Sequence, residues 1–201
     1  LLVDDTPGVV VVLLGSAAGR AAAASDAKDA AAAYVAAVRE VNEAHARKPG
    51  TAKEADLAAK VPKDARARFD RLLAAAPDAE ALAALEACAE AALDLDLVSD
   101  FEKAQARIRA ADAPRAERLG IVVSRPRFLL RALNGLEKGY AEGMADVIDE
   151  ILKAYDELFG FAEWSKVPGK KLRFRVHRED AIRNPPHFAP EFPFHSEIDF
   201  P

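Results

Sequence analysis

The sequence predicts a mainly α protein: an alanine-rich helical bundle followed by a small α+β element with two or three strands. In the first part of the chain, apolar residues recur three and four positions apart in alanine-rich segments. A segment with larger apolar side chains follows, and residues 172–177 then alternate between apolar and basic. We therefore expect an N-terminal apolar segment at 1–24, a helical bundle at 25–135, and a helix with short strands at 136–201.

The N-terminal segment has some features of an export signal. Residues 9–14 are apolar, and Ala22 and Ala24 are spaced as in an export cleavage site. Asp4 and Asp5, however, stand where a signal peptide carries basic residues, so a cytoplasmic location is favoured over export. The apolar run is much shorter than the ~20 residues that cross a bilayer, and no membrane span is predicted.

The bundle helices are delimited by prolines, which lack a backbone donor and clash with the preceding helical turn. Ser25 is the expected N-cap of the first helix, which ends before Pro49. Further helices are expected before Pro62, between Pro62 and Pro77, and from Pro77 to Pro114. Alanine favours helix but buries little area, so these helices need close neighbours, and an antiparallel bundle provides them.

The C-terminal element is predicted from a helical stripe and two alternating segments. One face of the helix carries large apolar side chains: Met144, Val147, Ile148, Ile151, Leu152, Tyr155, Leu158 and Phe159. A strand follows with Leu172, Phe174 and Val176 on one face, and residues 194–200 alternate in the same way. One face of each strand is expected to be buried.

The composition excludes several classes of function. Charged residues make up 30% of the chain and the net charge is −5, so there is no basic excess to hold nucleic acid. Cys88 is the only cysteine, which excludes an intrachain disulfide and a thiolate-rich metal site. It lies among Ala and Leu at helical spacing and is interpreted as a buried, inert thiol.

The C-terminal third resembles the start of the gluzincin-like (peptidase MA-like) zinc metallopeptidase domain. The resemblance covers residues 140–201 and rests on a helix ending in AYDELFGF, a loop with VPGKK, and a strand LRFRVH. It implies a helix packed on a small sheet, a later strand beside an active-site helix bearing H-E-x-x-H, a zinc cofactor, and a peptide or protein substrate.

The catalytic motif of that family does not occur in this chain. In H-E-x-x-H, two histidines one helical turn apart bind zinc and the glutamate activates its water. His45, His177, His187 and His195 do not form this pattern, so no catalytic or metal-binding residue is predicted here. Zinc is expected only if an H-E-x-x-H segment lies beyond Pro201.

Two functions follow as hypotheses. The leading one is a portion of a zinc-metallopeptidase-like protein, with the helical bundle as an accessory domain and no catalytic residues in this chain. It predicts an incomplete core, in which the sheet presents an apolar patch that needs covering, formed by Leu172, Phe174, Ile198 and Phe200. The alternative is a non-enzymatic helical scaffold or protein-interaction module whose small sheet caps the bundle.

The second predicted strand carries the candidate site residues. The family resemblance suggests that it is an edge strand that receives an extended peptide, with His195, Glu197 and Asp199 facing the substrate. These side chains, with His187 and Glu191, are also the richest group of metal-capable residues, but their spacing matches no standard zinc pattern. The alternative interpretation is a loop histidine and a solvent-facing strand.

The first predicted strand carries a basic patch. Arg173 and Arg175 share one face, where they could meet an anion. The interpretation we favour is a solvated face on which these arginines pair across the sheet with Glu197 and Asp199.

Overall fold

The computed structural model describes residues 17–46, 52–133, 135–159, 171–177 and 197–200. These residues form helices and strands in the order α1 (Ala17–Ala46), α2 (Glu54–Ala58), α3 (Lys63–Ala74), α4 (Ala79–Asp94), α5 (Val98–Ala111), α6 (Ala113–Arg118), β1 (Ile121–Ser124), β2 (Phe128–Ala132), α7 (Lys138–Phe159), β3 (Leu172–Val176) and β4 (Glu197–Phe200). The predicted fold class, a mainly helical bundle with a small α+β element, is confirmed.

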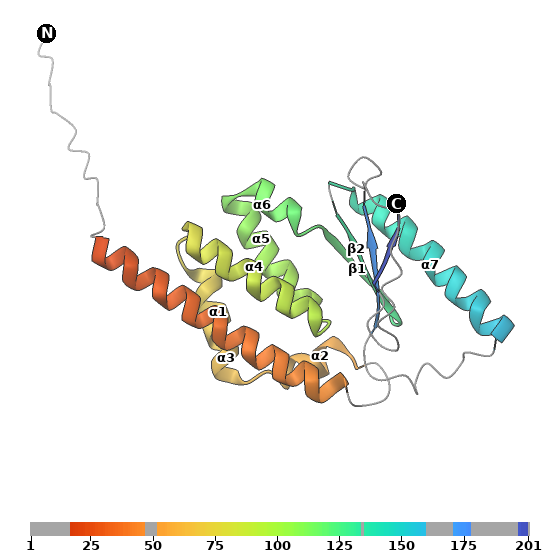
Figure 1. Cartoon of the computed structure of the whole chain (residues 1–201), viewed down its shortest axis with the longest axis horizontal. Coiled ribbons are helices and arrows are strands. Elements are labelled where there is room, and N and C mark those ends of the chain that lie inside the picture. The colour runs from red at the N-terminus through yellow and green to blue at the C-terminus, as the bar shows by residue number, and fades with distance from the viewer. Residues whose placement is uncertain (1–16, 47–51, 134, 160–170, 178–196, 201) are drawn as a thin grey trace, which may run out of the picture.

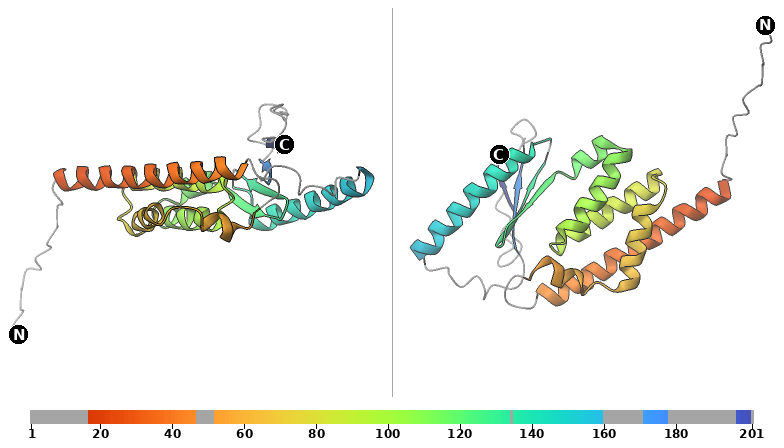
Figure 2. Two further views of the ribbon diagram at one scale, coloured as in Figure 1. Left: turned by 90° about the horizontal axis from the view of Figure 1, so that it is seen from below. Right: turned by 180° about the vertical axis from the view of Figure 1, so that it is seen from behind.

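The described elements form three layers. Helices α1–α6 make the bundle, the sheet stands beside it, and α7 covers the sheet face that is turned away from the bundle (Figure 1). Both views in Figure 2 show the same order, with α7 and the bundle on opposite sides of the strands. None of the described helices is long and apolar enough to cross a membrane.

The bundle is built on α4, which packs between α1 and α5. Its first turn is capped by Asp78, whose carboxylate accepts a hydrogen bond of 2.7 Å from the backbone N–H of Ala81. Its buried side chains are mostly small, so neighbouring helix backbones approach closely: Ala81, Leu82, Ala84, Leu85, Cys88, Ala89, Ala91, Ala92 and Leu93. The need of alanine-rich helices for close neighbours is met in this way.

Two helix predictions are wrong in detail. Ser25 lies inside α1, which begins at Ala17, so it is not an N-cap. The helix predicted from Pro77 to Pro114 is interrupted at Leu95–Leu97, where Asp96 has a positive φ of 61° and separates α4 from α5. A non-glycine residue in this left-handed conformation stops a helix, and Asp tolerates it better than most residues.

The sheet has the strand order β1-β2-β3-β4. Strands β1 and β2 form an antiparallel hairpin, whereas β2–β3 and β3–β4 are parallel pairs. Helix α7 lies in the connection from β2 to β3, as a parallel pair requires a long crossover. The described sheet thus has four strands where two or three were predicted.

The additional strands come from a region predicted to be helical. Strands β1 and β2 occupy residues 121–132, within the segment assigned to the bundle. In β2, Phe128, Leu129 and Leu130 are all buried, because the bundle covers one face and α7 the other. A strand buried on both faces shows no alternation, which is why a period of two did not reveal it.

Two separate apolar cores result from this arrangement. The first fills the bundle and includes Leu129 from the sheet. The second lies between the sheet and α7, where Phe128 and Phe174 meet edge to face with ring centroids 5.4 Å apart. Its helical side is formed by Ala141, Ala145, Ile148 and Leu152.

Candidate functional site

The carboxylate of Asp100 on α5 is a buried polar group that contacts three other side chains. Its side chain is only 5% exposed. The hydroxyl of Tyr34 on α1 donates to Oδ2 at 2.7 Å, and Nη1 of Arg66 on α3 donates to Oδ2 at 3.0 Å and Oδ1 at 3.2 Å. Three helices distant in sequence are therefore joined at one carboxylate.

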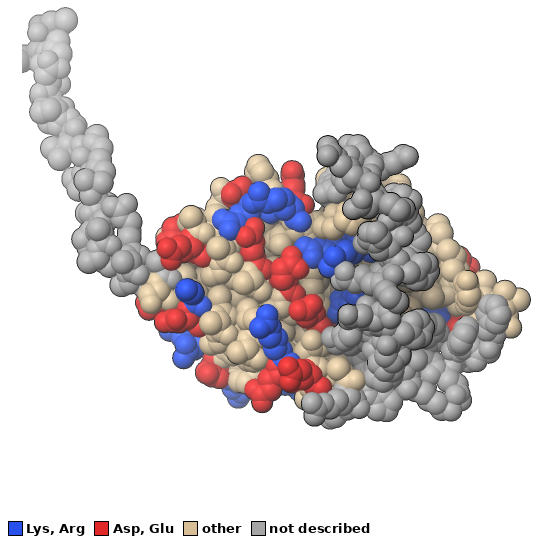
Figure 3. Space-filling model, in the orientation of Figure 1, with Lys and Arg blue, Asp and Glu red and all other residues tan. Residues whose placement is uncertain are grey.

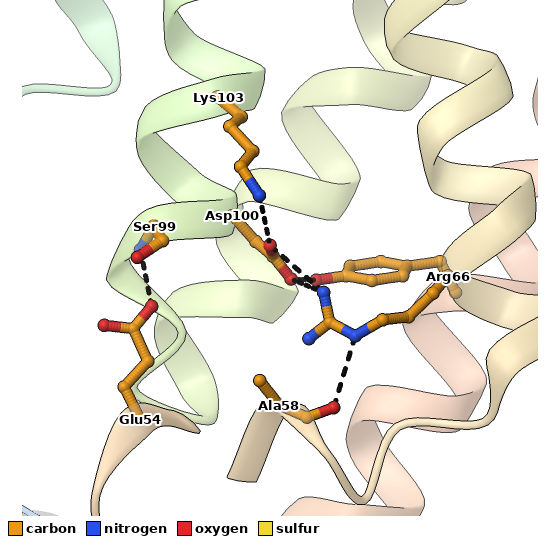
Figure 4. Close-up of polar contacts among 7 residues, drawn as sticks. Glu54, Ala58, Arg66, Ser99, Asp100 and Lys103 are labelled. Carbon is orange, nitrogen blue, oxygen red and sulfur yellow. Dashed lines mark hydrogen bonds and ion pairs between the residues drawn. The ribbon is translucent and has the colours of Figure 1, made fainter. Parts of the chain in front are cut away.

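Further contacts around Asp100 hold the short helix α2 in place. Figure 4 shows the side chains of Arg66 and Lys103 converging on the carboxylate, with Lys103 Nζ 3.6 Å from Oδ1. Nε of Arg66 also donates to the carbonyl of Ala58 at the end of α2, at 3.2 Å. At the other end of α2, Glu54 accepts the backbone N–H of Ser99 at 2.6 Å and so caps the first turn of α5.

Two ionisable groups that interact with Asp100 have raised pKa values, so both stay protonated at neutral pH. Burial, then the hydrogen bond to Asp100, raises the pKa of Tyr34 far above its ordinary value. Burial, and secondly the Asp100 charge, raises the pKa of the Cys88 thiol to about 12. Cys88 is fully buried in the bundle core. The prediction of a buried thiol is confirmed, and the raised pKa gives it little thiolate character at neutral pH.

This arrangement fits a structural role better than a chemical one. A general base needs a free lone pair within reach of the substrate, but the Asp100 oxygens are enclosed and already accept hydrogen bonds from Tyr34 and Arg66. Buried polar groups with this number of charge-assisted bonds fix the relative position of the elements that carry them. We therefore assign Asp100 to the stability of the bundle.

The basic patch predicted on the first strand is located on β3, and one of its arginines contacts the bundle. Arg173 is 20% exposed in its side chain and pairs at 2.8 Å with Asp96, so the prediction of a solvated position is wrong for this residue. Lys171, whose pKa is lowered by burial, donates to the hydroxyl of Ser124 at 2.7 Å. On the face in Figure 3, acidic and basic side chains are interspersed over the bundle.

Two of the three candidate site residues lie in the described part of the chain. Glu197 and Asp199 are in β4, which is the last strand at one end of the described sheet. Their backbones are opposite Arg173 and Arg175, as the predicted cross-strand pairing requires. His195 lies outside the described residues, and the peptide-binding role of this strand stays a prediction.

The histidines do not converge in the described structure. His45 is buried at the end of α1, and His177 follows β3. His187, Glu191 and His195 lie outside the described residues. Among the residues that are described, there is no group of three or more His, Cys, Asp and Glu side chains that could hold a metal ion.

Helix α7 combines a buried face with a large exposed apolar face. Of the side chains predicted to form one stripe, Ile148 and Leu152 are buried, whereas Val147 and Ile151 are 52% and 48% exposed. At 3.6 residues per turn the two sets are centred about 100° apart around the helix. The exposed set, called the α7 stripe below, consists of Tyr140, Val147, Ile151, Tyr155 and Leu158.

Comparison with protein-family models, curated proteins and solved structures found no match. The gluzincin-like resemblance of residues 140–201 therefore stays a prediction, and the function is argued below from the described residues.

Proposed function

We propose that this chain is a portion of a zinc-metallopeptidase-like protein in which the helical bundle is an accessory domain and β1–β4 with α7 begin the peptidase-like unit. The observation that carries the proposal is the exposure of the α7 stripe, because these large apolar side chains lie on a helix whose neighbouring face is buried in a packed core. The order of helix α7, strand β3 and strand β4 also agrees with the order of elements that the family resemblance implies.

The α7 stripe is unusual for the surface of a finished domain. Its five large apolar side chains are between 48% and 75% exposed and lie along a single helix of 22 residues. Single exposed apolar residues are normal, but contiguous apolar patches mark sites where another protein surface packs. The stripe therefore supports a larger unit in which further structure covers α7.

The position of this apolar surface differs from the one expected of an incomplete peptidase unit. That hypothesis predicted an apolar patch on the sheet, formed by Leu172, Phe174, Ile198 and Phe200. Phe174 is instead 7% exposed and packs with Phe128 in the second core, and Leu172 is half-buried, so the prediction of an exposed patch is wrong for Phe174. Among the described residues, the exposed large apolar side chains lie on α7.

The catalytic chemistry is assigned to sequence beyond Pro201. An H-E-x-x-H helix there would supply two zinc ligands and the carboxylate that activates the metal-bound water. The present chain would contribute the core on which that helix packs, and β4 as the edge strand for a peptide substrate. No residue described here is given a catalytic role.

Metal analysis of two forms of the protein tests the proposal. The full native-length protein and the segment ending at Pro201 are purified without chelator, dialysed, and measured by plasma mass spectrometry. We expect one zinc per chain in the longer protein and none in the segment. Absence of zinc from the longer protein would contradict the proposal, and zinc in the segment would show that the metal site had been placed wrongly.

A protein-interaction module is the second candidate, and the same α7 stripe supports it. In this case the stripe is covered by a separate protein, and the polypeptide carries no peptidase motif. The two candidates differ in a simple observation: the native protein contains H-E-x-x-H downstream of Pro201 in the first case and lacks it in the second.

A further inference from the structure

In the described part of the chain, the bundle and the sheet are connected by one covalent crossing. Helix α6 ends the bundle and Gly120 leads directly into β1, so all residues of the sheet and α7 follow this point. Gly120 has a positive φ of 74°. Its carbonyl accepts a hydrogen bond of 2.5 Å from the side chain of Gln105 on α5, which also donates to the carbonyl of Ala116 at 3.1 Å. The bundle thus holds the crossing from its own side.

The first contact across the junction is made by Arg131 of β2. Its guanidinium binds both carboxylate oxygens of Glu90 on α4, with distances of 2.6 and 2.9 Å. Its Nε donates to the carbonyl of Leu119 at 2.8 Å, immediately before the crossing. The Arg131 side chain is 12% exposed, whereas Glu90 is 50% exposed, so solvent reaches this pair from the bundle side.

The second contact is made by Arg173 of β3. It pairs at 2.8 Å with Asp96, whose side chain is 6% exposed, and it approaches the carbonyl of Asp94 at 3.4 Å. Asp96 is the residue with the positive φ that separates α4 from α5. Non-glycine residues in this conformation are uncommon and are found where a side chain must be placed precisely. Here the conformation accompanies a buried carboxylate that pairs with the sheet.

The two arginines act on the same face of the sheet. Arg131 is opposite Arg175 in the parallel register, and Arg173 is opposite Leu129, so all four lie on the face toward the bundle. Leu129 enters the bundle core between the two ion pairs, and Val122 packs against that core. The remaining apolar side chains of the sheet belong mainly to the second core with α7. Among the described residues, the junction therefore has little apolar contact and two ion pairs, of which Arg131–Glu90 is also doubly hydrogen-bonded.

We propose that Gly120 is a hinge between the bundle and the sheet with α7, and that Arg131 and Arg173 form a two-point latch that fixes one orientation. Most apolar side chains of each side belong to its own core, so release of the latch changes the orientation without unfolding either side, although Leu129 then leaves the bundle core. The two halves of the latch differ: the Arg131–Glu90 pair is open to competing ions, while the Arg173–Asp96 pair is buried. The inference does not depend on the peptidase hypothesis.

The distance between the two sides tests the latch. Spin labels are placed at the exposed positions Ala67→Cys on α3 and Ala154→Cys on α7, in a Cys88→Ala background, and the distance distribution is measured by pulsed electron paramagnetic resonance. We expect one narrow distribution for the parent. The Arg131→Met/Arg173→Met variant is expected to give a broadened distribution or a second population, with the helical circular dichroism retained.

A matched control removes two arginines that do not cross the junction. Arg125 pairs with Asp146 and Asp149, and Arg127 pairs with Asp156, all on the far side of the sheet. The Arg125→Met/Arg127→Met variant should keep the narrow parent distribution. A narrow parent-like distribution in the folded Arg131→Met/Arg173→Met variant would overturn the proposal.

A second variant covers the case in which the double arginine replacement does not fold. Glu90→Gln with Asp96→Asn removes the charges from the bundle side and preserves side-chain shape. If the latch fixes the orientation, this isosteric double variant should also broaden the distribution of distances between the spin labels. An unchanged distribution in this folded variant would overturn the proposal in the same way.

Discussion

Helices α4 and α7 are both amphipathic, but their surroundings differ. Helix α4 is rich in alanine and is enclosed by α1 and α5, so its small side chains are buried on several sides. Helix α7 carries larger apolar side chains and packs on one face of the sheet, and the α7 stripe is exposed. Side-chain size therefore does not indicate which helix is enclosed by its neighbours. Among the described residues, the bundle buries its apolar side chains internally, whereas α7 exposes the five side chains of the α7 stripe.

The largest loss of stability is expected from removing the buried carboxylate of Asp100. Asp100→Ala leaves the Arg66 guanidinium and the Tyr34 hydroxyl without their acceptor in a buried site. Loss of one partner of a buried charge pair costs about 3–5 kcal/mol. Urea unfolding should show this loss, while Asp70→Ala, at an exposed position of α3, should change the free energy of unfolding by less than about 0.5 kcal/mol. Equal effects of the two variants would contradict the assignment.

Substitutions on the buried face of α7 should destabilise the protein as core substitutions do. Ile148 is 4% exposed and lies between the helix and the sheet. Ile148→Ala is expected to lower the free energy of unfolding by about 2–4 kcal/mol, because it removes buried apolar surface and leaves a cavity. Chemical denaturation measures this value. A cost below about 1 kcal/mol would mean that α7 is not firmly packed on the sheet.

The crossing between the two regions should tolerate no side chain. A Cβ at Gly120 would lie 2.4 Å from the carbonyl oxygen of Ala132, and the φ of 74° disfavours any L-residue. Gly120→Ala is expected to cost at least about 2 kcal/mol in thermal or urea unfolding. The matched variant Gly139→Ala, in α7 with open space around the Cβ, should stabilise by up to about 1 kcal/mol, since alanine is the better helix former. The two Gly→Ala substitutions are therefore predicted to change the free energy of unfolding in opposite directions.

A smaller, pH-dependent effect is expected in the bundle core. Burial raises the pKa of Cys88 from 9.0 to about 12. The folded state thus holds this proton more tightly than the unfolded state, and stability that is present below pH 9 is lost as the pH rises toward 12. Cys88→Ala removes this contribution, so the wild type should lose up to about 1.4 kcal/mol per pH unit more than the variant in this window. The prediction would be contradicted if the free energies of unfolding of the wild type and of Cys88→Ala changed in parallel from pH 7 to 11.

The sequence predicted the bundle and α7 well because their helical signals are local. Alanine content, proline boundaries and the apolar spacing of residues 144–159 are properties of consecutive residues. The hairpin β1–β2 was missed because its short apolar runs fit either helix or strand, and burial on both faces removes the alternation that identifies a strand. Periodicity also predicted the apolar stripe of α7, but it cannot indicate which half of that stripe faces the sheet.

The polar features depend on contacts between distant residues. The hydroxyl of Tyr34 donates to Asp100, 66 positions away in sequence. Arg173 was expected to be solvated, and it instead reaches Asp96 in the turn between α4 and α5. Neither partner is marked by a local motif, so only the tertiary arrangement identifies them.

The measurement that tests the central claim most directly is a comparison of two identical substitutions on α7. Ile148→Ala removes a buried side chain and Ile151→Ala removes one that is 48% exposed, three positions away. In the segment ending at Pro201, Ile148→Ala should cost about 2–4 kcal/mol and Ile151→Ala less than about 1 kcal/mol. Equal costs would show that the α7 stripe is already covered in this chain, and the inference of missing structure over α7 would then be wrong.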